Sequence, residues 1–335
     1  MRDILPIWKG IIMDCYFAPM EGVTGYVFRN AHRRFYGNIT KYFTPFLAPN
    51  CSRKLSSRER NDILPEHNKG IMLVPQVLTN RAEDFIWAAQ AIQEFGYGEV
   101  NLNLGCPSGT VVTKYRGAGF LALPQELDRF LEKAARGMEQ MGMKFSIKTR
   151  IGKSDPDEFR QLLLIFNRYP LEKLIIHPRL QTDFYQNRPN FPVFQYAVEH
   201  SSNPLCYNGD IFSEEDFICF QNQFPTVPSI MLGRGLLQNP ALAETIADRG
   251  KDPTGKNPPQ QRLLRLRAFH DAVLEGYQNT IPGDRNVLFK MKELWSYWGK
   301  NFPGEGHLLK KLKKSRWIPE YTEAVDGILP RPPVS

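Results

Sequence analysis

Two side chains with reactive groups lie in or directly after short apolar segments of the sequence. Cys106 belongs to the polar segment Asn103-Leu104-Gly105-Cys106-Pro107-Ser108-Gly109, just past an apolar run. The neighbouring Lys114 and Arg116 could ease loss of its proton, so Cys106 could act as a nucleophile or as a general acid. Lys148 interrupts another apolar run. A buried lysine is costly unless it is paired, which favours a functional role for Lys148.

Polar residues and glycines also follow nearly all of the apolar runs in the first 240 residues. They are residues 18–22, Thr44, Gln76, Asn103, Arg150, His177, Arg179, Asn208, Gly209, Asp210, Gly233, Arg234 and Gly235. His177 taken alone is typical of a core histidine, but a full ring of such residues indicates a cofactor or substrate at one end of the strands. The amides of Gln76 and Asn103 suit the edge of a pyrimidine-like ring. The glycine turns with Arg234 favour a phosphate.

Some common nucleotide and metal motifs are absent from the sequence. No GxGxxG follows an apolar run, and no GxxxxGK[ST] occurs, which argues against a Rossmann dinucleotide site and a P-loop. No group of histidines, cysteines and carboxylates has zinc-site spacing.

Eight apolar runs alternate with amphipathic stretches along the first 240 residues. The runs are 16–20, 39–46, 71–78, 99–104, 144–151, 173–177, 204–207 and 229–232. The stretches with helical spacing include 82–95, 125–141, 157–169 and 213–223. Almost wholly apolar strands alternating with helices are typical of a parallel sheet covered by helices. Eight repeats predict an α/β fold of the (β/α)8 TIM-barrel type, with a doubly wound open sheet as the alternative.

The last quarter of the chain has a different pattern. Residues 248–260 are polar and rich in glycine and proline, which predicts a linker between a barrel domain, 1–247, and a second domain, 261–335. Helical periodicity over 262–278 and 285–299 predicts a small helical bundle there. The proline-rich tail 329–335 is expected to be loosely held.

Charge and cysteine content point to a cytoplasmic protein with a polyanionic partner. The net charge is +8, and residues 255–335 hold 14 Lys and Arg against 8 Asp and Glu. This basic surplus makes nucleic-acid contact one interpretation and a solvated surface the other. Five widely spaced cysteines without a CxxC pair are typical of a reducing compartment. We expect no signal peptide and no membrane helix, and a monomer.

Six motifs in order across residues 16–240 resemble those of the dihydrouridine synthase family. They are Ala18-Pro19-Met20-Glu21-Gly22-Val23-Thr24 with Phe28-Arg29, Asn101-Leu102-Asn103-Leu104-Gly105-Cys106-Pro107 with Gly117-Ala118-Gly119, Ile147-Lys148-Thr149-Arg150, Ile176-His177-Pro178-Arg179, Tyr207-Asn208-Gly209-Asp210-Ile211, and Met231-Leu232-Gly233-Arg234-Gly235 through Asn239-Pro240. The first motif combined with the cysteine segment is highly specific, whereas the glycine turns alone are not.

The resemblance implies an FMN-dependent enzyme that uses NADPH to reduce uracil bases within tRNA. Cys106 would be the acid that protonates C5, and the uracil would contact Asn103 and Arg179. The flavin would contact Pro19, Met20, Gln76, Lys148 and His177 through its ring system, and Asn208, Asp210, Gly233 and Arg234 through its ribityl chain and phosphate. Basic residues of the C-terminal domain would bind tRNA phosphates: Arg285, Lys290, Lys292, Lys310, Lys311, Lys313 and Lys314.

The sequence departs from the family pattern at three places. Gly25 stands where the family usually has Asp, Pro178 stands where it usually has Gly, and Thr44-Pro45-Phe46 lacks the usual Glu. These departures bear on substrate position more than on flavin binding.

Three other classes of protein remain open at this stage. A dihydroorotate dehydrogenase-like or ene-reductase-like barrel acting on a free small molecule would explain the barrel but not the basic helical domain. A flavin-free aldolase would use Lys148 as a Schiff-base amine. A non-catalytic RNA-binding barrel would not need Cys106.

Overall fold

The computed structural model describes residues 13–49, 52–248 and 259–331. Within these residues one sheet of parallel strands runs in the order β3-β2-β1-β9-β8-β7-β6-β5-β4. The strands are β1 (Asp14–Phe17), β2 (Lys41–Phe43), β3 (Leu73–Val74), β4 (Gln76–Val77), β5 (Glu99–Leu104), β6 (Lys144–Gly152), β7 (Lys173–Leu180), β8 (Leu205–Tyr207) and β9 (Ser229–Leu232). Each overlaps one of the predicted apolar runs, and β3 and β4 share the run 71–78.

The sheet is a nearly closed barrel with eight strand positions, because β3 and β4 together occupy one position. Pro75, which has no N–H, separates them. β3 pairs with β2 and β4 pairs with β5. An isolated parallel bridge joins Leu47, in the segment after β2, to Val77 of β4 and so closes the ring of strands. The (β/α)8 TIM-barrel prediction is therefore confirmed and the open sheet is excluded.

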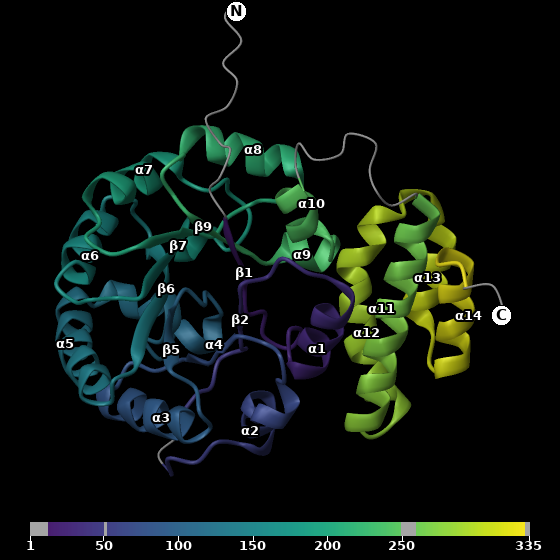
Figure 1. Cartoon of the computed structure of the whole chain (residues 1–335), viewed down its shortest axis with the longest axis horizontal. Helices are drawn as coiled ribbons and strands as arrows, with labels where there is room; N and C mark the ends of the chain where they lie inside the picture. Colours follow the sequence, from purple (N-terminus) through teal and green to yellow (C-terminus); the bar gives the residue numbers. More distant parts are fainter. Residues whose placement is uncertain (1–12, 50–51, 249–258, 332–335) are drawn as a thin grey trace, which may run out of the picture.

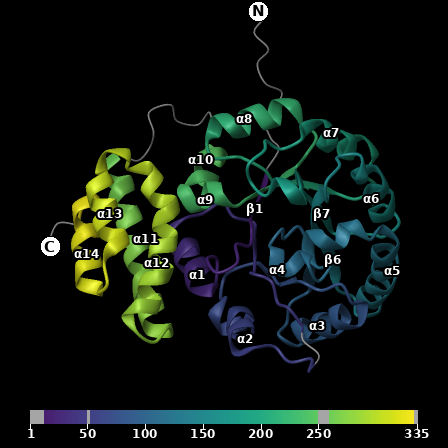
Figure 2. The same cartoon turned by 180° about the vertical axis from the view of Figure 1, so that it is seen from behind.

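Helices surround the barrel in Figure 1 and, from behind, in Figure 2. They are α1 (Tyr26–Phe35), α2 (Ser57–Ile63), α3 (Ala82–Glu94), α5 (Pro124–Gln140), α6 (Glu158–Phe166), α7 (Phe191–His200), α8 (Glu214–Gln223), α9 (Arg234–Gln238) and α10 (Leu242–Asp248). The short helix α4 (Gly109–Val112) lies inside this ring. α6 shows why they pack there: the apolar face predicted by Phe159, Leu162, Leu163 and Phe166 is buried. Burial of such a face against the strands stabilises the helix more than its intrinsic propensity does.

Five short 3-10 helices complete the described secondary structure. They are Pro65–His67, Gly117–Ala122, Gln181–Asp183, Gly299–Asn301 and Pro303–Glu305. The second of them follows the cysteine segment, and the third follows β7.

The C-terminal residues form the predicted helical bundle, composed of α11 (Pro259–Thr280), α12 (Asp284–Trp298), α13 (Gly306–Lys314) and α14 (Ile318–Ile328). The α12 face carrying Leu288, Met291, Trp295 and Trp298 is buried. Aromatic contacts join this bundle to the barrel: the ring of Phe269 lies 5.4 Å from Phe28 of α1. The bundle therefore stands beside α1 and α9 (Figure 1).

Two predictions fall mainly outside the described residues. Residues 249–258 of the predicted linker 248–260 lie outside the described part of the chain, and so do residues 332–335 of the predicted tail 329–335. The domain limits 1–247 and 261–335 stay predictions. Among the described helices, none combines the length and apolarity that crossing a bilayer requires.

Candidate active site

The register of the parallel strands brings the predicted site residues to one rim of the barrel. Asn103 of β5 lies beside Lys148 of β6, and Arg150 of β6 lies beside His177 of β7. Because all strands are parallel, their carboxyl ends share this rim. The Asn208 side chain donates to the carbonyl of Met231 at 2.8 Å, which ties the segment after β8 to β9.

The end of β9 also approaches the loop after β1. A Cβ atom added to Gly233 would lie 3.4 Å from the Cβ of Ala18. Pro19 and Met20 follow Ala18 directly. The structure thus brings the predicted flavin-ring and phosphate residues to neighbouring positions.

Residues 105–109, the cysteine loop, are held mainly through backbone groups. Asn103 Oδ1 accepts the N–H of Gly105 at 3.0 Å and that of Cys106 at 2.9 Å. The carbonyl of Cys106 accepts the N–H of Ala118 at 3.0 Å. Gly117 has φ +55°, and a Cβ there would lie 2.8 Å from that carbonyl. Glycine at this position is therefore needed for the close approach.

Arg150 connects the cysteine loop to the segment after β7. Its Nε donates to the carbonyl of Gly105 at 3.0 Å. Its two terminal nitrogens donate to the carbonyls of Leu180 and Phe184, each at 2.6 Å. The sequence marked Arg150 only as a polar strand end; the structure gives it a positioning role.

The thiol of Cys106 is held in its protonated form. Burial raises its pKa, and the nearby cations Arg150 and Lys148 only partly oppose this. The sequence had indicated that Lys114 and Arg116 would lower this pKa. That interpretation is wrong, because desolvation of the thiolate outweighs the attraction of the neighbouring positive charges. A protonated thiol suits a general acid better than a nucleophile.

Lys148 projects into the barrel and is half-buried. Burial and the neighbouring Arg150 lower its pKa to about 8. Among the described residues no hydrogen bond or ion pair to its ammonium is found. A half-buried cation beside the amides of Gln76 and Asn103, with no partner among the described residues, fits the electron-rich edge of a flavin ring.

A cluster of charged side chains lies at the ends of β7, β8 and β9. The Arg179 guanidinium is 1% exposed. It donates to both oxygens of Asp210, and it donates to Nε2 of His177 at 2.9 Å. Burial and nearby cations, first Lys148, lower the pKa of His177 well below its usual value. The ring is therefore neutral, with Nε2 accepting and its proton on Nδ1.

Arg234 completes this cluster and reveals a residue that sequence reasoning missed. It pairs with Asp210 at 2.5 Å, and its guanidinium lies 4.5 Å from the ring centre of Tyr185. Arg150 also stacks on this ring, at 5.5 Å. Tyr185 lies in the segment after β7, where no sequence motif distinguishes it.

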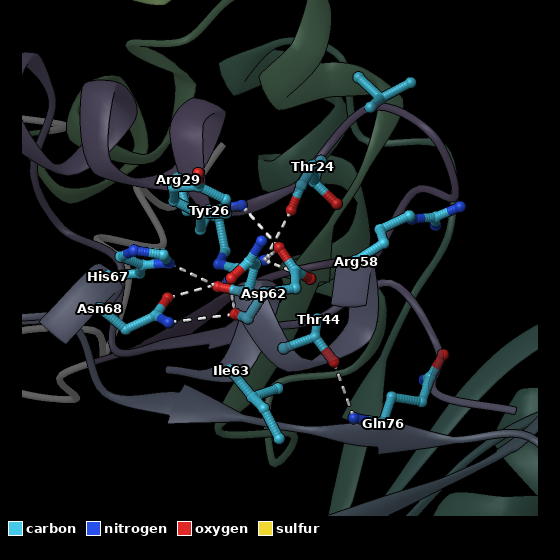
Figure 3. A network of polar contacts seen from close by, with 12 residues as sticks. Thr24, Tyr26, Arg29, Thr44, Arg58, Asp62, Ile63, His67, Asn68 and Gln76 are labelled. Carbon is cyan, nitrogen blue, oxygen red and sulfur yellow. Dashed lines mark hydrogen bonds and ion pairs between the residues drawn. The ribbon is translucent and has the colours of Figure 1, made fainter. Parts of the chain in front are cut away.

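Figure 3 shows a second buried network, which holds the start of α1. Arg29 is 1% exposed and donates to the Asp62 carboxylate, the Asp62 carbonyl and Asn68. It also donates to the carbonyl of Thr24, whose hydroxyl accepts the N–H of Met20. The network therefore fixes the loop that carries the predicted flavin contacts.

Asp62 supplies the carboxylate that position 25 lacks. Gly25 is the N-cap of α1 and has no side chain to cap it. Instead, Asp62 Oδ1 accepts the N–H of Tyr26 at 2.7 Å. A Cβ on Gly25 would lie 3.5 Å from that same oxygen. A carboxylate from α2 thus caps α1 from outside.

Together, the fold and this rim define a TIM-barrel enzyme whose site combines a protonated thiol, a lysine with no partner among the described residues and two arginines that share one carboxylate. Comparison with known proteins gives the family. The model of the family described as dihydrouridine synthase matches residues 16–303. The chain therefore belongs to the dihydrouridine synthase family, and as a member of it is an FMN-dependent oxidoreductase.

Similar proteins cover nearly the whole chain. A probable tRNA-dihydrouridine synthase of Staphylococcus epidermidis is 25% identical over 92% of this chain and 91% of its own. A tRNA-dihydrouridine(16) synthase of Neisseria meningitidis is 26% identical over 88% and 89%. Among solved structures, histamine dehydrogenase from Rhizobium sp. 4-9 aligns with a TM-score of 0.55 at 12% identity, over 77% of this chain and 48% of that one. The last likeness concerns the fold alone.

We predict that the capping role can be moved between positions 62 and 25. Asp62→Ala should lower the free energy of unfolding by on the order of 3 kcal/mol, because it leaves Arg29 buried and unpaired. Adding Gly25→Asp to that variant should recover part of the loss, whereas Gly25→Asp alone should destabilise by placing two carboxylates together. Chemical denaturation of the four proteins measures this cycle, and equal effects of Gly25→Asp in both backgrounds would contradict it.

The lowered pKa of Lys148 predicts a pH-dependent stability of the flavin-free protein. Below pH 8 the half-buried ammonium is charged and costs stability. Between about pH 8 and 10.5 the folded protein loses this proton while the unfolded chain keeps it, so stability rises with pH. Lys148→Met should therefore be more stable than wild type at pH 7, with the difference shrinking towards pH 10. A difference independent of pH in thermal unfolding would refute the prediction.

Proposed function

We propose that this protein reduces the C5–C6 double bond of uridine in tRNA to 5,6-dihydrouridine, with NADPH as the reductant. The observation that carries the proposal is a protonated thiol, Cys106, fixed on a loop beside the partnerless Lys148. A hydride acceptor such as C6 needs a proton source at C5, and a neutral thiol supplies one. The curated relatives named as tRNA-dihydrouridine synthases support the same reaction.

The residues at the rim fit FMN. FMN held by these residues would supply hydride-transfer chemistry, with NADPH as the source of the reducing equivalents. Lys148 would stabilise negative charge on the ring, while Gln76 and the Nδ1–H of His177 would hydrogen-bond its edge, and Pro19 and Met20 would border it. These groups come from four strands: Pro19 and Met20 follow β1, and Gln76, Lys148 and His177 lie in β4, β6 and β7.

The ribityl chain and phosphate would lie at the ends of β8 and β9. Asn208, Gly233 and Arg234 would hold them, with Arg234 as the cation. Asp210 already binds both Arg179 and Arg234. We therefore propose that Asp210 acts chiefly by orienting Arg234 towards the phosphate.

The uracil would contact Asn103 and Arg179. Asn103 Nδ2 donates one of its two N–H groups to Gln76 Oε1, and the other could meet a uracil oxygen. The guanidinium of Arg179 is enclosed by Asp210, His177 and the carbonyl of Asn187. The target base would have to leave the RNA stack to reach this recessed site, at a cost of a few kcal/mol.

The helical bundle offers a surface for the tRNA. Of the predicted basic residues, Lys290, Lys292 and Lys311 bind the carbonyl of Gly22, the carbonyl of Ser315 and Glu323, respectively. The others, Arg285, Lys310, Lys313 and Lys314, are exposed. Two exposed aromatic residues accompany them, Phe289 at 69% and Trp317 at 61%. Basic groups beside exposed rings are typical of surfaces that grip phosphates and stack bases.

Membership of this family argues against the flavin-free aldolase with Lys148 as a Schiff-base amine. The remaining alternative is an FMN enzyme that acts on a free small molecule. Such an enzyme would be yellow but would leave tRNA unchanged.

The central test is Cys106→Ala in the FMN-loaded protein. We expect the yellow colour and NADPH oxidation to persist, while dihydrouridine formation in tRNA falls by about 10²- to 10⁴-fold, the range for loss of a general acid. Cys219→Ala, which alters an exposed cysteine elsewhere, should change neither. Quantifying dihydrouridine by mass spectrometry of tRNA measures the effect, and a normal rate in Cys106→Ala would remove its assigned role.

The bundle surface predicts a salt-dependent loss of tRNA affinity. Lys313→Ala with Lys314→Ala should weaken binding and reduce the slope of log affinity against log salt by about 1 to 2. The matched control is Arg129→Ala with Lys133→Ala, which removes the same charge from α5. Titration at several salt concentrations distinguishes the two, and an equal loss in the control would assign the effect to net charge instead. Monomeric state and cytoplasmic location stay predictions.

A further inference from the structure

Three polar side chains project from one face of β5 into the barrel. Glu99, Asn101 and Asn103 alternate along the strand, which places them on the same face, and all three are buried. At about 3.3 Å per residue they span roughly 13 Å of the interior. Asn103 lies at the rim beside the cysteine loop, and Glu99 lies at the opposite end.

Hydrogen bonds link these side chains into one chain through the neighbouring strands. Asn103 Nδ2 donates to Gln76 Oε1 at 2.7 Å, and Gln76 Nε2 donates to Asn101 Oδ1 at 2.8 Å. Asn101 Nδ2 donates to Ser146 Oγ at 3.0 Å, and the Ser146 hydroxyl donates to Glu99 Oε1 at 2.8 Å. Every bond therefore runs in the same direction, from the cysteine loop to the carboxylate.

The two ends of the chain fix this direction. At the rim, the N–H groups of Gly105 and Cys106 can only donate, so they require the oxygen of Asn103. At the other end the Glu99 carboxylate can only accept, and its second oxygen binds Lys41 Nζ at 2.5 Å. The amides and hydroxyl between could each point either way. Bonds aligned head to tail also strengthen one another in a dry interior.

We propose that Glu99 is a positioning residue for Cys106. Its carboxylate sets the direction of the chain and so presents the oxygen of Asn103 to the N–H groups of the cysteine loop. The catalytic consequence rests on the proposed function, since it requires Cys106 to be the proton donor. The structural consequence, a fixed cysteine loop, does not.

A Glu99→Gln variant should reverse the chain. The Lys41 ammonium attracts the oxygen of the new amide, so the amide NH₂ turns to Ser146. Ser146 then donates to Asn101, and each amide turns over until Asn103 presents its NH₂ to the cysteine loop. Donors face donors there, and the bonds that hold Cys106 are lost.

The Cys106 amide can be observed alone in the FMN-loaded, full-length protein. Gly105-Cys106 is the only Gly-Cys pair in the sequence, so ¹³C-carbonyl glycine with ¹⁵N-cysteine gives one correlated NMR signal. In Glu99→Gln we expect its proton to shift upfield and to exchange about tenfold faster. The kcat for dihydrouridine formation should fall about tenfold with KM unchanged.

Two further variants separate positioning from general disruption. Adding Lys41→Met to Glu99→Gln should restore the signal and kcat, because the introduced amide can then turn its oxygen to Ser146. Glu172→Gln is the matched control: Glu172 lies 3.6 Å from Lys41 in the same ion cluster but outside the chain. It should leave the Cys106 signal unchanged. If Glu99→Gln does not fold, Glu99→Asp can take its place. Its shorter side chain keeps the charge but withdraws the carboxylate from Ser146, and it should change the Cys106 signal in the same direction by a smaller amount.

The outcomes distinguish this inference from the proposed function. An unaltered Cys106 signal in Glu99→Gln, an equal change in Glu172→Gln, or no recovery with Lys41→Met would overturn the positioning role. If the signal moves as expected but no protein, wild type included, makes dihydrouridine, the proposed function fails and the positioning role stands.

Discussion

The parallel register of β4, β5 and β6 is the constraint on which the site depends. It sets Gln76 against Asn101 and Asn103 against Lys148, so that polar side chains from three strands meet inside an otherwise apolar barrel. A one-residue slip in this register would turn these side chains outward. The apolar cluster around the strands holds the register, and the register in turn makes the interior polar groups each other's partners.

The charged side chains at the rim differ in whether they have a counter-ion, and this difference sets the electrostatics of the site. Arg179 and Arg234 share one carboxylate, Asp210, whereas Lys148 faces the barrel mouth with no counter-ion among the described residues. The mouth therefore carries uncompensated positive charge suited to an anionic ring and phosphate. The same burial that lowers the pKa of Lys148 raises that of Cys106. Desolvation at this rim thus keeps the thiol neutral and strengthens the attraction of the Lys148 ammonium for an anionic ligand.

Positions that depart from the family pattern show how the fold compensates. Gly25 lacks the usual carboxylate, yet α1 is capped by Asp62 and tied to the Met20 loop through Arg29 and Thr24. The compensation comes from α2, more than thirty residues away. No local reading of the motif around Gly25 could reveal it, because it depends on how α2 packs against α1.

The sequence by itself determined the eight strand positions of the barrel, the helical bundle and the set of residues at the rim. It could do so because the periodicity of a strand and the residues at its end are local properties. Only the tertiary structure decided how those residues are used. Burial, not the nearby Lys114 and Arg116, sets the proton affinity of Cys106. Arg150 holds the cysteine loop, Tyr185 stacks on Arg234, and Glu99 terminates the chain that reaches Asn103. These are contacts between segments far apart in the sequence, and desolvation and hydrogen-bond direction arise only when such segments meet.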